Sequence, residues 1–136
     1  MRNAVNGFHH IAIKASDFDK SVAFYKALGL VERVRWGEGD NRAVMLNMGD
    51  GGLIELFAGG SVREKTADEV NEHWMHLALK VDDVEYAYTT ALDAGATART
   101  APMIVSPEGS EPAMRMHIAF VYGPDGEIIE FFKELI

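Results

Sequence analysis

The sequence predicts an α+β fold made of two copies of one βαβββ module. Two observations support this prediction. The first is an internal repeat that recurs in register across both halves of the chain. The second is the pattern within each half, where an alternating apolar run precedes a segment of helical spacing and further strand-like runs follow it.

The repeat begins with the segments HIAIK at 10–14 and HLALK at 76–80, which coincide when His10 is aligned with His76. Further positions match in the same alignment: Asp17 with Asp83, and Gly29 with Gly95. Several identities in one register are hard to obtain by chance, so we interpret the chain as a duplication.

Later in the chain the offset between matching positions becomes larger, and GGLIELF at 51–57 aligns with GEIIEFF at 126–132. The extra residues of the second half must therefore lie between Gly95 and Gly126. We expect them in the stretch 100–116, which contains prolines and looks irregular.

In the first half, residues 8–15 alternate and predict a strand. Asp17 can cap the following helix, expected over 19–28, because its carboxylate can accept N–H groups of the first turn. Gly29 then supplies a left-handed cap at the end of this helix. Three further strands, separated by Gly-rich turns, are predicted at 31–36, 42–48 and 53–58.

The second half repeats this order. We expect a strand at 74–81 and a helix at 84–94 that ends at Gly95. The three strands that follow are predicted near 97–101, at 116–122 and at 127–133, with a turn at 123–126 between the last two. The chain is thus expected to be one domain, 1–136, with module one at about 6–58, a linker at 59–73 with a short helix at 64–71, and module two at about 74–134.

Composition excludes several classes of function. The 136-residue chain has a net charge of −8, which argues against a nucleic-acid partner. It has no apolar run long enough to span a bilayer and no signal-peptide core, so we expect a cytoplasmic protein without a membrane partner. It has no cysteine, which excludes disulfides, thiolate metal sites and cysteine nucleophiles.

Each half places one His and one Glu at equivalent positions: His10 and Glu55 in the first, His76 and Glu130 in the second. Each Glu lies in an apolar strand, where a buried carboxylate needs a partner. A lone strand His is more often a surface or hydrogen-bonded residue, and a lone Glu can lie at an edge or bind an Arg. Recurrence in register favours metal ligation for all four.

Two imidazoles and two carboxylates suit one divalent ion such as Ni²⁺, Zn²⁺, Co²⁺, Mn²⁺ or Fe²⁺. We leave out His9 and His73, because an odd offset along a strand points to the opposite face from His10 and His76. His117 has no counterpart in the first half and is interpreted as a pocket or surface residue.

Lys14 and Lys80 each follow a candidate ligand His by four residues, which places each Lys on the face of that His. Either these cations lie at solvated strand ends, or they bind an anionic group of a substrate.

The repeat, the strand openings HIAI and HLAL, the helix phrase SVAFYKALGL at 21–30 and the segment GPDGEIIE at 123–130 resemble the vicinal oxygen chelate superfamily. This group contains glyoxalase I, bleomycin-resistance proteins and extradiol dioxygenases. The resemblance implies a cup-shaped mixed sheet, a homodimer, and one divalent metal held by His10, Glu55, His76 and Glu130. It also implies catalysis through an enediolate, with Glu130 as base and Glu55 as its partner carboxylate.

The resemblance implies a metal-dependent lyase or isomerase of glyoxalase I type, acting on a small carbonyl or thiohemiacetal substrate, possibly a thiol adduct. Lys14 stands where glyoxalase I carries an Arg, so the resemblance leaves the identity of the thiol cosubstrate open. The alternatives are another metalloenzyme of this scaffold (an epimerase, thiol transferase or dioxygenase) and a binding protein that sequesters a small molecule.

Overall fold

The structure is a computed structural model that describes residues 8–62, 75–110 and 112–135. The chain divides into two compact units, Met1–Ser61 and Val62–Ile136, and each contains one module. The first module consists of β1 His10–Lys14, α1 Phe18–Ala27, β2 Val31–Trp36, a 3₁₀ turn at Gly39–Asn41, β3 Ala43–Asn47 and β4 Leu53–Phe57. The second consists of β5 Leu77–Lys80, α2 Val84–Asp93, β6 Thr97–Val105, β7 Arg115–Tyr122 and β8 Ile128–Leu135. The predicted α+β class and the duplicated βαβββ order are confirmed.

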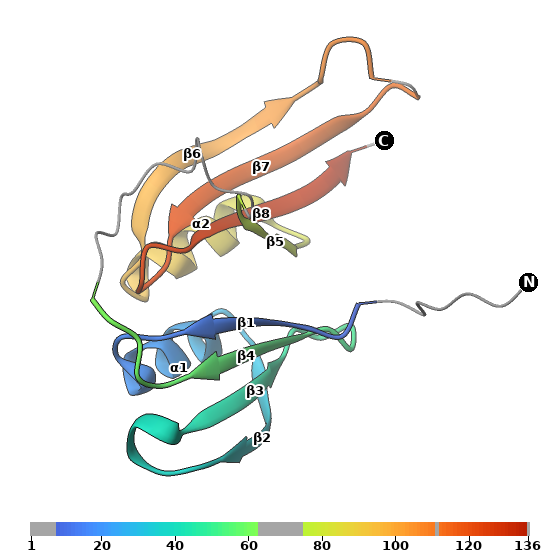
Figure 1. The fold of residues 1–136 in the computed structure, drawn as a ribbon. Helices are drawn as coiled ribbons and strands as arrows, with labels where there is room; N and C mark the ends of the chain where they lie inside the picture. Colours follow the sequence, from blue (N-terminus) through green and yellow to red (C-terminus); the bar gives the residue numbers. More distant parts are fainter. Residues whose placement is uncertain (1–7, 63–74, 111, 136) are drawn as a thin grey trace, which may run out of the picture. The chain divides into compact units, whose positions relative to one another are not determined.

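Each module forms its own four-stranded mixed sheet (Figure 1). The strand orders are β1-β4-β3-β2 and β5-β8-β7-β6, so the same order occurs twice. The first strand of each module pairs with the last in parallel, whereas the other pairs are antiparallel. This order brings the two segments that the repeat singles out, one with the His and one with the Glu, next to each other in each sheet.

The two helices have the same kinds of N-terminal and C-terminal caps. The side chains of Asp17 and Asp83 accept hydrogen bonds from the backbone N–H groups of Lys20 and Tyr86, at 3.1 and 3.0 Å. Each helix is followed by a glycine in the left-handed region, Gly29 and Gly95, with φ of 103° and 104°. The predicted caps are therefore confirmed in both copies.

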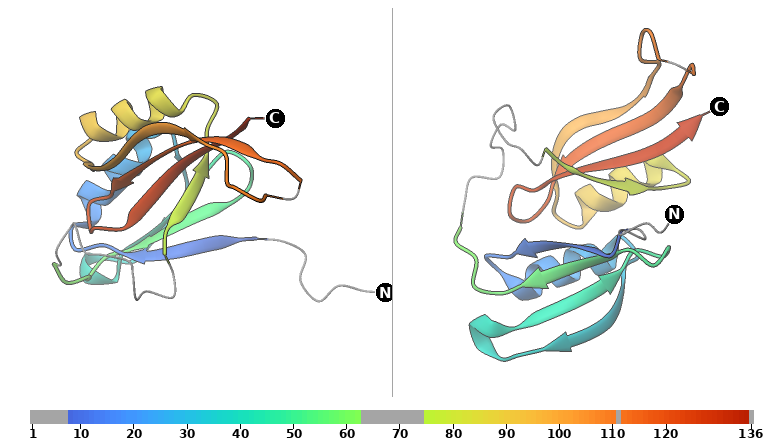
Figure 2. Two further views of the ribbon diagram at one scale, coloured as in Figure 1. Left: turned by 90° about the horizontal axis from the view of Figure 1, so that it is seen from above. Right: turned by 45° about the vertical axis from the view of Figure 1, so that its right-hand side comes forward.

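One face of the first sheet is turned toward α1. Glu32 of β2 lies opposite Leu46 of β3, which lies opposite Ile54 of β4, so these three side chains share a face. Glu32 also pairs with Lys26 of α1 at 3.1 Å, which identifies this face as the helix side. Residues one step away along each strand, Glu55 among them, consequently face away from the helix. In the second module α2 likewise lies along its own sheet (Figure 2).

A β-bulge occurs at the same place in both modules. The register shifts between Glu32 and Val34 in β2, and between Ala98 and Thr100 in β6. The extra residue is Arg33 in the first module and Arg99 in the second, and these two positions coincide when His10 is aligned with His76. The duplication therefore extends to an irregularity of the sheet.

The expectation that the stretch 100–116 is irregular is wrong for much of its length. Strand β6 continues to Val105 and β7 begins at Arg115, so the extra residues lengthen a hairpin. Pro102 is compatible with a strand here because β6 lies at the sheet edge and the register shifts again between Thr100 and Met103.

The short helix expected at 64–71 lies outside the described residues. Among the described residues, no helix is long and apolar enough to cross a membrane.

Candidate functional site

His10 and Glu55 lie together on the sheet face that is turned away from α1. In the parallel pair of β1 and β4, Glu55 lies opposite Ala12, two residues after His10, so both side chains emerge on one face. The Nε2 atom of His10 lies 3.3 Å from Oε1 of Glu55. Glu55 is only 8% exposed, whereas His10 is exposed, so the imidazole stands between a buried carboxylate and the surface.

The second module repeats this pair. Glu130 of β8 lies opposite Ala78 of β5, two residues after His76. The Nε2 atom of His76 lies 3.2 Å from Oε1 of Glu130, which is also 8% exposed. The same offset, contact and burial therefore occur in both copies of the module.

The structure thus gathers the four predicted ligands as two His–Glu pairs, one in each unit. Within residues 8–62, 75–110 and 112–135 there is no group of three or more His, Asp or Glu side chains that could hold a metal ion. Each module by itself brings together one imidazole nitrogen and one carboxylate oxygen.

Apolar side chains lie next to both pairs. Met45 lies opposite Glu55, and Phe57, one pleat further along β4, contacts the ring of Trp36 with 6.5 Å between centroids. In the second module Phe120 lies opposite Glu130, and its ring centroid is 5.3 Å from that of His76. An apolar surrounding lowers the local dielectric and strengthens charge interactions at the two carboxylates.

Lys14 and Lys80 lie at the ends of β1 and β5, opposite Phe57 and Phe132. By register they share the faces of Glu55 and Glu130, as expected from the spacing. Both are exposed. Four residues of strand separate the Cα atom of His10 from that of Lys14 by about 13 Å, so Lys14 lies well beyond the first pair.

The expectation that His9 faces away from His10 is wrong. Their Nδ1 atoms lie 2.9 Å apart, and their rings meet edge to face with 5.1 Å between centroids. His9 precedes the first residue of β1, so the pleat of the strand does not fix its direction. In the β7–β8 pair, His117 lies opposite Lys133, and Phe120 lies opposite Glu130. His117 is three residues from Phe120, so its side chain is on the sheet face opposite to that of Glu130. His73 lies outside the described residues.

Sequence reasoning missed the arginine at the two bulges. The guanidinium carbon of Arg99 lies 5.2 Å from the ring centroid of Phe120 and 6.0 Å from that of Tyr122. Arg99 therefore lies on the Glu130 face. The signal was present in the sequence, because Arg33 and Arg99 coincide in the alignment that matches the two strand openings.

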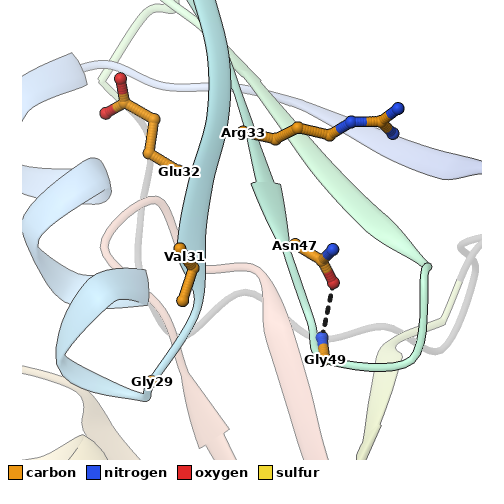
Figure 3. Close-up of a pocket in the computed structure, with 6 residues that line it drawn as sticks. All are labelled: Gly29, Val31, Glu32, Arg33, Asn47 and Gly49. Carbon is orange, nitrogen blue, oxygen red and sulfur yellow. Dashed lines mark hydrogen bonds between the residues drawn. The ribbon is translucent and has the colours of Figure 1, made fainter.

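A hollow of about 340 Å³ lies elsewhere in the first module, and none of the predicted site residues lines it (Figure 3). Its lining consists of Gly29, Val31, Glu32, Arg33, Asn47 and Gly49. Figure 3 shows Glu32 and Arg33 on opposite sides of β2. The side-chain oxygen of Asn47 accepts the backbone N–H of Gly49 at 2.7 Å. This hydrogen bond accounts for the direction of the amide.

Residues 7–131 match the family described as the Glyoxalase/Bleomycin resistance protein/Dioxygenase superfamily. The chain belongs to this superfamily. The resemblance inferred from the repeat and its motifs is therefore confirmed over nearly the whole chain.

Relatives in the superfamily include two proteins named "Probable lactoylglutathione lyase". The one from Vibrio parahaemolyticus is 30% identical over 132 residues, which cover 91% of this chain and 88% of the relative. The one from Vibrio cholerae is 29% identical over 130 residues, with the same coverage of both chains.

Among solved structures, a glyoxalase family protein from Bacillus cereus has a TM-score of 0.76. It is 19% identical, and the match covers 99% of this chain and 98% of that one. This likeness shows the fold of the superfamily.

Proposed function

We propose that the protein is a metal-dependent lyase or isomerase of glyoxalase I type, which acts on a small carbonyl or thiohemiacetal substrate. The observation that carries the proposal is the duplicated His–Glu pair, with 3.3 and 3.2 Å between nitrogen and oxygen. We further propose that His10, Glu55, His76 and Glu130 together hold one divalent metal ion.

The residues fit such an ion. Two ligands about 2.1 Å from a metal, at the angles of octahedral or tetrahedral coordination, lie about 3.0–3.4 Å from each other. The separation of Nε2 and Oε1 in each pair falls within this range. The two carboxylates are buried among apolar neighbours, where a dication offsets the cost of burying their charges.

Four ligands from nitrogen and oxygen, with no cysteine in the chain, suit Ni²⁺, Zn²⁺, Co²⁺, Mn²⁺ or Fe²⁺. The metal, when bound, would act as a Lewis acid that stabilises negative charge on a substrate oxygen.

The protein's own side chains supply the proton transfer. We propose that the carboxylate of Glu130 takes a proton from one substrate carbon and returns it to the neighbouring carbon, and that Glu55 is its partner carboxylate. Each carboxylate lies within 3.3 Å of an imidazole nitrogen and is largely shielded from water, which places it beside the proposed metal ligands in a site that little solvent reaches. Lys14 and Lys80 would bind an anionic group at a distance from the reacting carbons.

Metal analysis of protein purified without chelator tests the proposal. We expect wild type to retain about one metal per site, and Glu55→Gln and Glu130→Gln to retain much less. Glu134→Gln is the matched control, because Glu134 is exposed and lies four residues after Glu130 on the same strand.

An assay with methylglyoxal and a panel of thiols follows. Turnover by the metal-loaded wild type supports the glyoxalase type, and absence of turnover with every thiol contradicts it while leaving the metal site standing. If wild type and all variants are equally free of metal, the enzyme proposal is wrong and a binding protein that sequesters a small molecule becomes the better interpretation.

A further inference from the structure

We propose that His9 is a positioning residue for His10: its Nδ1 accepts the Nδ1 proton of His10 when Nε2 of His10 binds the metal. The inference rests on the proposed function, because it concerns the outer hydrogen bond of one proposed ligand. It assigns a role to a residue outside the set of four ligands.

The two nitrogens of His10 have different neighbours. Its Nε2 lies 3.3 Å from the carboxylate of Glu55, and its Nδ1 lies 2.9 Å from Nδ1 of His9. A nitrogen pair at this distance needs one N–H donor and one lone pair. The lone pair of Nε2 must be free to bind a metal, which leaves the proton of a neutral imidazole on Nδ1. His10 is then the donor in this contact and His9 is the acceptor.

The position of His9 is fixed by the strand that carries Glu55. The backbone carbonyl of His9 accepts the N–H of Leu53, the first residue of β4, at 3.0 Å. The rings of His9 and His10 are nearly perpendicular, at 83°. The backbone of His9 is thus held beside β4, and its exposed imidazole lies against the ring of His10.

The proposed hydrogen bond between His9 and His10 has no equivalent in the second module. The residue at the equivalent place in the second module is Met75, whose thioether is at most a weak acceptor. Loss of the His9 side chain should therefore affect only one of the two proposed imidazole ligands. Met75 also supplies a matched control, because it is exposed and directly precedes His76.

Zn²⁺ affinity, measured by competition with a chromophoric chelator, tests the inference without any assay of activity. Outer hydrogen bonds to a ligand His contribute about 10- to 100-fold to metal affinity. We expect His9→Ala to bind Zn²⁺ about 10-fold more weakly than wild type, and Met75→Ala to bind like wild type. His9→Asn should recover most of the affinity, because its amide oxygen can take the place of Nδ1.

Nitrogen-15 NMR of the Zn²⁺-loaded protein provides a second readout, which reports on the Nδ1 proton of His10 directly. In wild type and His9→Asn, His10 should show a proton on Nδ1 that exchanges slowly with water, and in His9→Ala that proton should exchange rapidly. If wild type binds Zn²⁺ but His9→Ala binds equally well with unchanged exchange, the role of His9 is refuted and the metal site stands. If wild type binds no Zn²⁺, the proposed function and this inference are both wrong.

Discussion

Glu55 lies opposite the residue two places after His10, with 3.3 Å between Oε1 and Nε2. The equivalent pair of the second module has the same offset and a separation of 3.2 Å. Because the first and last strands of each module are parallel neighbours, a His at the start of the first strand, or one residue before it, meets a Glu of the last strand on one sheet face. The parallel pairing thus places the repeated His and Glu in the same side-chain contact in both modules.

Metal binding should stabilise the folded protein. At a free Zn²⁺ concentration about 100 times Kd, the ion adds about 2.7 kcal/mol to the free energy of unfolding and should raise Tm by roughly 5 °C or more. Thermal unfolding with Zn²⁺ and with excess chelator measures the increment. It should largely vanish in Glu55→Gln and persist in Glu134→Gln. Equal increments in the two variants would remove Glu55 from the proposed ligand set.

Glu130→Gln should lower kcat more than it lowers metal content. Positioned general bases contribute about 10²- to 10⁴-fold to rate, so we expect a loss of roughly 100-fold or more per bound metal ion. The measurement is steady-state kinetics normalised to metal content, with Glu55→Gln beside it. If the two variants lose activity only in proportion to metal, neither carboxylate acts as the base.

Lys14→Met should weaken the binding only of substrates that carry an anionic group far from the reacting carbons. Lys14 shares the face of His10 but lies about 13 Å along the strand, so a charge there can contact a distant carboxylate without touching the reacting carbons. We expect KM for an anionic thiol adduct to rise about 5- to 10-fold, and KM for a neutral adduct to stay the same. Lys20→Met, an exposed change on α1, is the control. A similar rise in KM for both adducts would argue against charge recognition by Lys14.

Glu32 should make the free energy of unfolding depend on pH in the acid range. Hydrogen bonds from Arg35, and then from Lys26, lower the pKa of Glu32 from 4.5 to about 2. Because the folded-state pKa is below the unfolded value, the stabilisation is complete above 4.5 and is lost as pH falls toward about 2.

Denaturant titrations of metal-free protein at several pH values test this expectation. The difference in free energy of unfolding between wild type and Glu32→Gln should be constant near neutral pH and shrink across the acid range. Glu108→Gln, in the exposed loop after β6, is the control. A difference between wild type and Glu32→Gln that does not vary with pH would contradict the assignment.

Much of the fold could be predicted because local signals occur twice. The caps at Asp17 and Asp83 and the left-handed glycines at 29 and 95 need only a few neighbouring residues to form. The length of β6 could not be predicted in this way. Its continuation to Val105 depends on pairing with β7, a partner that a reading of residues 100–105 alone does not include.

The sequence by itself determined the duplication, the order of elements and the four residues that recur as His and Glu. These follow from residue identity and spacing, which a repeat makes visible without coordinates. Only the tertiary structure decided that each His meets its Glu across a parallel strand pair, that Arg33 and Arg99 occupy bulges, and that His9 contacts His10. The physical reason is that register, bulges and ring contacts depend on which strands pair and where the strand pleat begins.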